Sequence, residues 1–555
     1  MRVRILLLGL VFLGGCDRTD ATQADAAVPM DAGVRDDDGG ARAVGDAGEG
    51  ADMVPAVSTP QPLIPGTGLY PRVIRLGVGA AAGTIVASVV ASQASGHLGG
   101  TILASHDDGL SFAVVGHIDT PLAAAGLCCA TLYELPRAVG ALAAGTLLWA
   151  ASIGGDTQAQ PMSIPVWSSS DAGHSWTALG TIVTATVPRS SGGLWEPEFA
   201  LLADGTLVCQ YSDETDSAHS QKLVEARSGD GVTWGSSTAT VALTDAAARP
   251  GMANVRLLPN GTYLMTYELC PVAGYDCAAH VRFSSDGWNW GDPTDPGVVP
   301  TTVDGRFFAH TPTIVWSDSP GANGRWYLVG QIVDDASGAA APENGAVLFA
   351  NSESATHNWY EVPAPVTVMA PTDSYCPNYS ASVLLLDDGQ IGLEVATRLD
   401  GTVCHAYFAR GRLLGSGDAS GVAAGDSKRL VDVFSGLCLD GSSGAIVQAT
   451  CDGMPAQSWT FVAAANGDFA LKAEGSGQCL TGANPSDGAI TREACDGSAA
   501  QSWTLHNVGI GAYVLGHAGT SACLDDSAGS TASGNPMQLW SCNDLSTQIW
   551  HFESP

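Results

Sequence analysis

Positively charged residues are scarce in this chain of 555 residues, which has 23 Lys and Arg against 56 Asp and Glu. The resulting formal net charge of −33 excludes nucleic acid as an expected partner, because phosphate groups repel an acidic surface. After the first 16 residues no apolar run is long enough to span a bilayer. No His and Cys residues have the spacing of a zinc site, so we expect neither a metal nor another cofactor.

Glycine, by contrast, is abundant. The chain has 68 glycines and 45 % hydrophobic residues, and only 14 % of its residues are charged. This composition is typical of a turn-rich, all-β protein rather than a helical one. The length indicates more than one domain.

The N-terminal segment has the features of a targeting signal. Arg2 and Arg4 precede an apolar stretch that ends in Leu-Gly-Gly-Cys16, so residues 1–16 resemble a bacterial lipoprotein signal peptide with lipidation of Cys16. The alternative is an ordinary secretory signal with an incidental cysteine; both place the mature protein outside the cytoplasm. Residues 17–60 are rich in Ala, Asp and Gly, and we predict a disordered acidic linker. The expected membrane contact is therefore the N-terminal lipid alone, on a protein that we expect to be a monomer.

Six prolines recur next to apolar segments, at intervals of roughly 53 to 65 residues, a period that suits propeller blades. A proline at the first residue of a strand removes no hydrogen bond that the sheet needs, so we interpret each as the start of an innermost strand. Six such units predict a six-bladed β-propeller over residues 61–415, followed by a linker over 416–426. The prolines are Pro71, Pro136, Pro197, Pro250, Pro312 and Pro377.

Four segments in step with these units combine Ser, Asp and Gly with a final aromatic residue. They lie at 105–112, 169–176, 228–234 and 284–290. In such turns Asp and Ser side chains bond the turn backbone and Gly adopts a positive φ. The segments resemble Asp boxes, the hairpin turns of sialidase-type propellers, and we assign them a structural role.

Two glutamates are the candidate catalytic residues. Trp195-Glu196-Pro197-Glu198 places carboxylates at the start of the third predicted innermost strand, and Glu268 ends a strand of the next unit. We therefore expect Glu196 and Glu268 to face each other. Glycosidases use such a carboxyl pair, one member of which must be protonated near neutral pH.

These motifs carry a resemblance to a known family. The Trp-Glu-Pro element, followed some seventy residues later by Asn-Gly-Thr-Tyr-Leu-Met-Thr-Tyr-Glu, is similar to glycoside hydrolase family 93. The resemblance implies a six-bladed exo-α-1,5-L-arabinanase that releases arabinobiose from the non-reducing end of arabinan with retention. It implies Glu196 and Glu268 as the catalytic pair, with the nucleophile and the acid/base not assigned between them. The candidate substrate-binding residues are Arg72, Trp195, Glu198, Arg249, His310 and either Tyr375 or Tyr379.

Two other functions stay open at this point. A sialidase would use three arginines to hold a carboxylate, and Arg72, Arg249 and Arg306 are the candidates for that role. The first unit, however, reads Tyr-Pro-Arg-Val where sialidases usually carry Arg-Ile-Pro. The second alternative is a propeller that binds glycans without cleaving them.

The C-terminal region, residues 427–555, contains three copies of about 45 residues that each end in Gln-x-Trp, a period typical of repeat folds. They resemble a ricin-B type β-trefoil carbohydrate-binding module, which makes the whole chain all-β. Compared with the sugar-binding residues that such modules use, the third copy of this chain has the fullest set and the first copy a partial set. The second copy, with Thr481 and Arg492, lacks them. The candidates are Asp525, Gln538, Trp540 and Gln548 in the third copy and Asp440, Gln448 and Gln457 in the first.

Each trefoil copy contains two cysteines that can close a local disulfide: Cys438–Cys451, Cys479–Cys495 and Cys523–Cys542. Seven cysteines remain in the propeller region. Among them Cys270 and Cys277 are close enough in sequence for a short loop, and Cys376 and Cys404 are a further candidate pair. An odd number leaves at least one cysteine without an intramolecular partner.

Overall fold

The computed structural model describes residues 57–271, 276–318, 324–352, 358–386, 389–415, 417–482 and 488–555. The predicted signal peptide, Cys16 and nearly all of the predicted 17–60 linker lie outside these ranges. Among the described residues no helix is long and apolar enough to cross a membrane.

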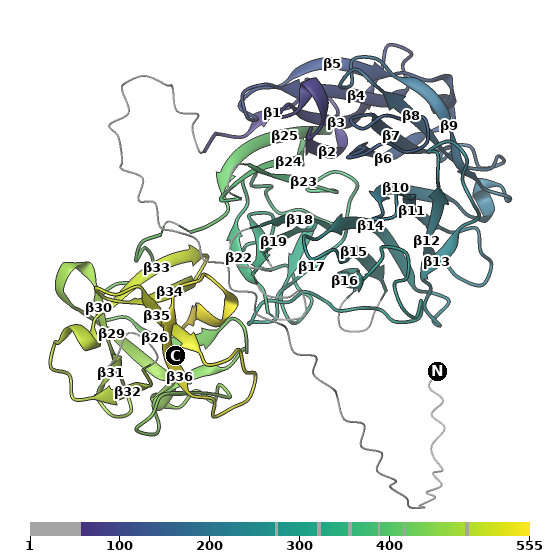
Figure 1. Ribbon diagram of the computed structural model, residues 1–555. Coiled ribbons are helices and arrows are strands. Elements are labelled where there is room, and N and C mark those ends of the chain that lie inside the picture. Colours follow the sequence, from purple (N-terminus) through teal and green to yellow (C-terminus); the bar gives the residue numbers. More distant parts are fainter. Residues whose placement is uncertain are drawn as a thin grey trace, which may run out of the picture. The chain divides into compact units, whose positions relative to one another are not determined.

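Six antiparallel sheets form a β-propeller (Figure 1). Blade one contains β2 (Leu69–Arg75), β3 (Ile85–Ser92), β4 (Leu98–Ser105) and β5 (Ala113–Ile118), and blade two β6 (Leu127–Glu134), β7 (Leu147–Ile153), β8 (Ser163–Ser169) and β9 (Thr177–Thr184). Blade three contains β10 (Leu194–Leu201), β11 (Leu207–Asp213), β12 (Lys222–Ser228) and β13 (Thr238–Val241). Blade four contains β14 (Arg249–Leu257), β15 (Tyr263–Cys270), β16 (Ala278–Ser284), β17 (Phe307–Ala309) and β20 (Ile332–Asp334). Blade five contains β18 (Thr313–Ser317), β19 (Arg325–Val329), β21 (Val347–Asn351) and β22 (Tyr360–Pro363). Blade six contains β23 (Ser382–Leu386), β24 (Ile391–Asp400), β25 (Val403–Arg412) and β1 (Gln61–Pro62).

The blades close into a ring. The innermost strands β2, β6, β10, β14, β18 and β23 contact one another in this order, and β23 contacts β2. The N-terminal strand β1 completes blade six by pairing with β25, which joins the two ends of the propeller. Second strands such as β7 are apolar and buried along their whole length, because neighbouring blades cover both of their faces. The predicted six-bladed propeller is confirmed.

Four of the six prolines lie at the start of an innermost strand as predicted: Pro71 and Pro197 are the third and fourth residues of β2 and β10, Pro250 is the second residue of β14, and Pro312 directly precedes β18. Pro71, Pro197 and Pro312 share one register position, directly before the residue at which regular pairing with the second strand begins or resumes. The same position holds Ala130, Ala253 and Ala381 in the other blades. Pro136 lies after β6, and Pro250 and Pro377 precede the equivalent position by three and four residues. Alanine occupies this position in half of the blades, so a proline does not identify the position in every blade.

The four Ser-Asp-Gly turns share one pattern of hydrogen bonds. In the first, Asp107 Oδ1 accepts from the Ser111 backbone N–H at 3.0 Å and Ser105 Oγ accepts from the Gly109 N–H at 2.8 Å. The equivalent bonds recur in the turns around Asp171, Asp230 and Asp286. The glycine of each turn has a positive φ, between 74° and 92°. These aspartates therefore stabilise the turns by accepting hydrogen bonds from the turn backbone.

The C-terminal strands form the predicted trefoil around a separate apolar core that includes Trp459, Trp503 and Trp550. The strands are β26 (Ser427–Asp432), β27 (Cys438–Asp440), β28 (Val447–Ala449), β29 (Ser458–Ala463), β30 (Phe469–Ala473), β31 (Cys479–Gly482), β32 (Ile490–Glu493), β33 (Trp503–Gly509), β34 (Ala512–His517), β35 (Ala522–Asp526), β36 (Met537–Ser541) and β37 (Ile549–Glu553). Short 3₁₀ turns occur at η1 (Gly79–Ala81), η2 (Pro121–Ala125), η3 (Arg189–Ser191), η4 (Pro455–Gln457), η5 (Ala465–Gly467), η6 (Ala499–Gln501) and η7 (Ser546–Gln548).

The predicted disulfides are all present. The trefoil contains Cys438–Cys451, Cys479–Cys495 and Cys523–Cys542, and the propeller contains Cys270–Cys277 and Cys376–Cys404. A sixth disulfide, Cys128–Cys129, joins adjacent residues and was not predicted. Of the cysteines in the described ranges, the buried Cys209 alone is unpaired.

Candidate active site

One backbone irregularity recurs at the start of the innermost strands. In blades one to four, two residues of the innermost strand lie opposite one residue of the second strand, so each innermost strand has a β-bulge at the same place. The residue in each bulge has a positive φ, which non-glycine residues seldom adopt. Blades five and six carry positive-φ residues at the equivalent positions. We call this set the bulge residues: Tyr70, Cys129, Glu196, Met252, Thr311 and Ser380.

The second strands contribute another equivalent position. Ser152, Ser212 and Glu268 each pair with the residue that precedes a bulge residue. Their side chains accept hydrogen bonds from the bulge residue of the following blade: Ser152 from Glu196 N–H at 3.1 Å, and Glu268 from Thr311 N–H at 2.8 Å. Glu268 is thus an acid at a position that holds serine in blades two and three.

These two positions bring the candidate acids together. Glu196 comes from a bulge in blade three, and its Oε2 would lie only 3.5 Å from a Cβ added at Gly251. Gly251 in turn pairs directly with Glu268. Because directly opposed residues in antiparallel strands have Cα atoms about 5 Å apart, the two carboxylates lie side by side over Gly251. The structure therefore brings together the predicted pair from adjacent blades.

The surroundings of Glu196 favour its protonated form. Its Oε2 accepts hydrogen bonds from Ser212 Oγ at 2.8 Å and from Met252 N–H at 3.1 Å. Burial, and then the charge of nearby Glu268, raise the pKa of Glu196 to about 7. A carboxyl group with this pKa can donate a proton at neutral pH.

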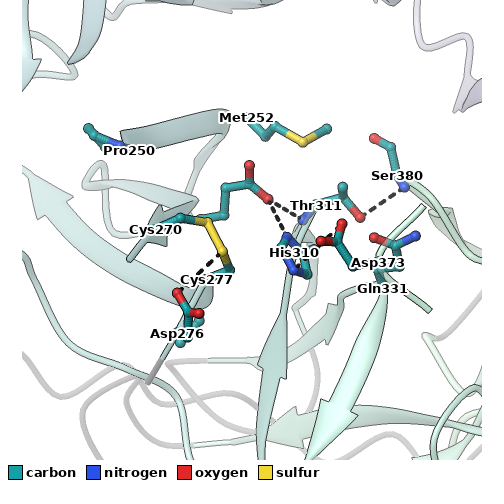
Figure 2. Close-up of polar contacts among 12 residues, drawn as sticks. Pro250, Met252, Cys270, Asp276, Cys277, His310, Thr311, Gln331, Asp373 and Ser380 are labelled. Carbon is teal, nitrogen blue, oxygen red and sulfur yellow. Dashed lines mark hydrogen bonds and ion pairs between the residues drawn. A yellow bond between two sulfur atoms is a disulfide. The ribbon is translucent and has the colours of Figure 1, made fainter. Parts of the chain in front are cut away.

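Glu268 has positively polarised partners instead, His310 and the Thr311 backbone; Figure 2 shows these two residues with Asp373 beside His310. Besides the Thr311 N–H, His310 Nδ1 lies 3.6 Å from Glu268 Oε2, and His310 Nε2 lies 3.9 Å from Asp373 Oδ1. Burial alone would lower the pKa of His310, but its hydrogen bond and charge interaction with Glu268 outweigh burial and raise it. His310 therefore carries more positive charge near neutral pH than an ordinary histidine, and this charge lies beside the Glu268 side chain.

Of the two candidate tyrosines, the structure places Tyr379 at the acids. Burial raises the pKa of Tyr379, and the charges of Glu196 and Glu268 raise it further, so its hydroxyl stays protonated. Tyr70 lies 6.1 Å from Tyr379 between ring centroids. Tyr375 is 71 % exposed, on the loop whose carbonyl groups bond Gln331 Nε2. Tyr379, not Tyr375, is thus the tyrosine within the electrostatic range of both acids.

Two predicted substrate-binding residues, Glu198 and Arg72, have hydrogen-bond partners inside the propeller. The buried Glu198 accepts hydrogen bonds from Thr131 Oγ1 at 2.9 Å, Asn254 Nδ2 at 2.9 Å and Arg256 Nη1 at 3.0 Å. The buried Arg72 donates to Ser380 Oγ at 3.0 Å. Both side chains line a cavity of about 390 Å³ among the innermost strands. Their assignment as substrate contacts stays a prediction: protein groups hold both side chains, and both also line this cavity.

Trp195 and Arg249 belong to one network centred on Glu214. Trp195 Nε1 donates to Glu214 Oε2 at 3.0 Å, and Arg249 Nη2 donates to Glu214 Oε1 at 2.6 Å. The Arg189 guanidinium lies 4.7 Å from the Trp195 ring centroid, so it covers the indole. Burial opposes ionisation of Glu214, but these donors outweigh it and lower the pKa of Glu214. Glu214 escaped the sequence analysis because no motif marks it.

The three arginines considered for a sialidase each have hydrogen-bonding or ion-pair partners within the protein. Arg72 is buried and bonded to Ser380, and Arg249 is paired with Glu214. Arg306 is paired with Glu361 at 2.9 Å and with two further acids. Each guanidinium is thus already paired with protein groups.

One group of possible metal ligands occurs near Glu268 in the described ranges. Cys270, Cys277 and His310 have ligand atoms within 4.8 Å of one another. The two sulfur atoms are joined in a disulfide, so they offer no thiolate to a metal.

The third trefoil copy contains a cavity of about 560 Å³ at the predicted sugar site. Asp525, Gln538 and the half-exposed Trp540 line it, and Gln538 Nε2 donates to Asp525 Oδ1 at 2.7 Å. Gln548 is fully buried and donates to Asp525 Oδ2 at 3.0 Å, so it positions Asp525 rather than facing the cavity.

The first trefoil copy differs from the prediction. Gln448 is fully buried and bonds Ser435 and two backbone carbonyl groups of the third copy. Gln457 is buried and donates to Asp440 Oδ2 at 3.1 Å. We correct Gln448 and Gln457 to internal hydrogen-bonding residues, because their amides are used by protein groups.

Comparison with known proteins agrees with this architecture. Residues 426–550 match the profile of the ricin-type beta-trefoil lectin domain. The propeller is similar to the GH93 arabinanases. The α-L-arabinanase of Penicillium chrysogenum, solved with arabinobiose, has 25 % identity and a TM-score of 0.55 over 65 % of this chain and 99 % of its own. The GH93 α-L-arabinofuranosidase of Fusarium graminearum, solved with arabinobiose, has 24 % identity and a TM-score of 0.53 over the same shares. No curated protein sequence matches the chain. The resemblance expected from the sequence is confirmed.

Proposed function

We propose that the propeller is a retaining exo-glycosidase that releases arabinobiose from the non-reducing end of α-1,5-L-arabinan. The observation that carries this proposal is the pair Glu196 and Glu268, in unlike surroundings on adjacent blades. The similarity to an arabinanase solved with arabinobiose supports the choice of substrate.

The two acids take different roles in this mechanism. Glu196, with a pKa of about 7, protonates the leaving glycosidic oxygen. Glu268, stabilised as a carboxylate by His310 and the Thr311 N–H, attacks the anomeric carbon and forms a glycosyl-enzyme intermediate. Glu196, now ionised, then takes a proton from the water that hydrolyses the intermediate.

The trefoil gives the enzyme a second carbohydrate contact. The cavity beside Trp540 combines an exposed aromatic face with a buried carboxylate, the combination that suits a sugar ring. A module bound to the polysaccharide raises the local concentration of chain ends at the propeller.

We also infer from the N-terminal sequence that the protein is exported and anchored through Cys16, acting as a monomer on a tether. Incorporation of labelled palmitate into the wild type, and its loss in Cys16→Ser, tests this proposal. Equal labelling of both proteins would contradict it.

Product analysis on linear α-1,5-arabinan tests the activity. We expect arabinobiose as the sole early product, with the α-configuration seen in its initial NMR spectrum, and no product from Glu268→Gln. A β-configured initial product would overturn retention. Release of sialic acid from a sialoside, without arabinan cleavage, would favour a sialidase, and binding without cleavage of either glycan would favour a lectin.

A further inference from the structure

Cys128 and Cys129 form a disulfide between adjacent residues of β6. The other five disulfides join cysteines separated by 7 to 28 positions. In the chain-entropy account, a disulfide stabilises a protein by closing a loop in the unfolded chain. A bond between neighbours encloses no intervening residue, so it gives almost no stabilisation of this kind. Its contribution must lie in the local surface that it forms.

That surface lies at the catalytic acids. Cys129 is the bulge residue of blade two, with φ 60°, and so has the position that Glu196 has in blade three, also with φ 60°. Cys128 pairs with Ser152, whose Oγ accepts the backbone N–H of Glu196 at 3.1 Å. The disulfide is therefore beside the proposed acid, on the side away from Glu268.

The disulfide is also part of an apolar surface that remains partly open. Both cysteines are half-buried, and Cys129 packs against the cluster that contains Tyr70 and Met252, with Tyr379 on the same cluster. Trp195, the sequence candidate for stacking on a sugar, is instead covered by Arg189 and bonded to Glu214. A disulfide is polarisable and has no hydrogen-bond donor, so it gains dispersion contacts from the C–H groups of a sugar ring.

We propose that the Cys128–Cys129 disulfide is a sugar-binding platform of the catalytic site, against which the apolar face of a sugar unit next to Glu196 packs. This inference rests on the proposed glycosidase function, and it assigns to blade two a substrate contact that the carboxyl pair does not provide. The relevant property is an apolar, sulfur-bearing surface at the blade-two bulge.

Two variants test the platform. Cys128→Ser with Cys129→Ser removes the disulfide and leaves polar hydroxyl groups of similar size. Cys128→Ala with Cys129→Met restores an apolar sulfur at the bulge, where blade four already carries Met252 with φ 58°. The control is Cys479→Ser with Cys495→Ser, which opens a disulfide in the trefoil copy without the predicted sugar residues. The measurements are thermal unfolding, kcat and KM on arabino-oligosaccharides, and the inhibition constant of arabinobiose.

We expect the serine variant to raise the KM and the inhibition constant by about tenfold, as the loss of a small apolar contact does, and to shift Tm little. The alanine–methionine variant should recover most of this loss. The control should show the opposite pattern, a lowered Tm of the trefoil with unchanged KM. An unchanged inhibition constant in the serine variant, or an equal loss in both propeller variants, would overturn the platform and leave the glycosidase function standing. A wild type that releases no arabinobiose would overturn both.

Discussion

Glu196→Gln tests the central claim about the site, because it removes one titrating group and little else. Glutamine keeps the shape of the side chain and an oxygen that accepts from Ser212 and the Met252 N–H. In the wild type the pKa of Glu196 is raised from 4.5 to about 7, so the folded protein binds this proton more tightly than the unfolded chain does. Below pH 4.5 Glu196 is protonated in both the folded and the unfolded chain, so it does not lower the stability of the fold. As the pH rises from 4.5 to 7, the unfolded chain loses this proton first, and the free energy of unfolding decreases.

The structure sets the size of this effect. A shift from 4.5 to about 7 corresponds to about 3 kcal/mol of destabilisation above pH 7. Because the Glu196 side chain is only half-buried, solvent screens part of the cost and the value is an upper limit. The glutamine variant never ionises here, so we expect it to match the wild type at pH 4 and to be more stable at pH 8, by up to this amount.

Thermal unfolding of both proteins at pH 4, 6 and 8 measures the difference. Other buried acids with raised pKa values, such as Glu225, Glu361 and Glu394, titrate equally in both proteins, so their effects cancel. A stability difference that does not change with pH would refute the raised pKa of Glu196.

The same variant tests the role of the acid. We expect kcat/KM on arabino-oligosaccharides to fall by roughly 10²- to 10⁴-fold, the usual contribution of general acid–base catalysis. An aryl arabinoside with an acidic leaving group needs no protonation, so its glycosylation step should be far less affected. The wild-type decline in kcat/KM above about pH 7 should be absent in the variant. Equal losses on both substrates would show that Glu196 is not the acid.

Two further substitutions address the spacing of the acids and the trefoil site. Gly251→Ala places a methyl group 3.5 Å from Glu196 Oε2 and 2.6 Å from Gln221 Nε2. We expect this crowding to lower kcat about tenfold and to leave the far-UV circular dichroism spectrum unchanged. An unaltered kcat would contradict the close packing over Gly251. Trp540→Ala should weaken binding to arabinan about tenfold in an affinity gel without changing kcat on short oligosaccharides, because it removes an aromatic face from the trefoil cavity alone. Asp440→Ala is the matched control in the first copy and should leave the affinity unchanged; similar losses in both variants would contradict a single competent site.

The architecture was readable from the sequence because the repeats leave strong marks. Gln-x-Trp recurs in each trefoil copy, since its Trp fills the shared core and its Gln bonds the same backbone positions each time. The Ser-Asp-Gly turns mark the blades for a similar reason. The period of the propeller was therefore predictable even though two of the six prolines, Pro136 and Pro377, do not lie at the start of an innermost strand.

The site was readable only in part, because its key positions carry no repeated residue. The bulge position holds six different residues, although all six have a positive φ. Glu196 and Glu268 were predicted from their motif context, whereas Cys129 and Tyr70 have none. The bulge also decides that Glu196 and Glu198 face different surroundings, and an extra residue in one strand cannot be recognised from alternation alone.

The origin of the unlike acids lies in this repeated backbone. A residue in a bulge reaches over the neighbouring blade, among apolar bulge residues such as Met252, and its carboxyl group loses solvation. A residue at the second-strand position instead meets the free N–H of the next bulge, which serine satisfies in blade two and Glu268 satisfies in blade four. One acid is thus placed where the proton is retained, and the other where negative charge is hydrogen-bonded. The propeller repeat provides both environments in adjacent blades, so two acids at its equivalent positions have unlike surroundings.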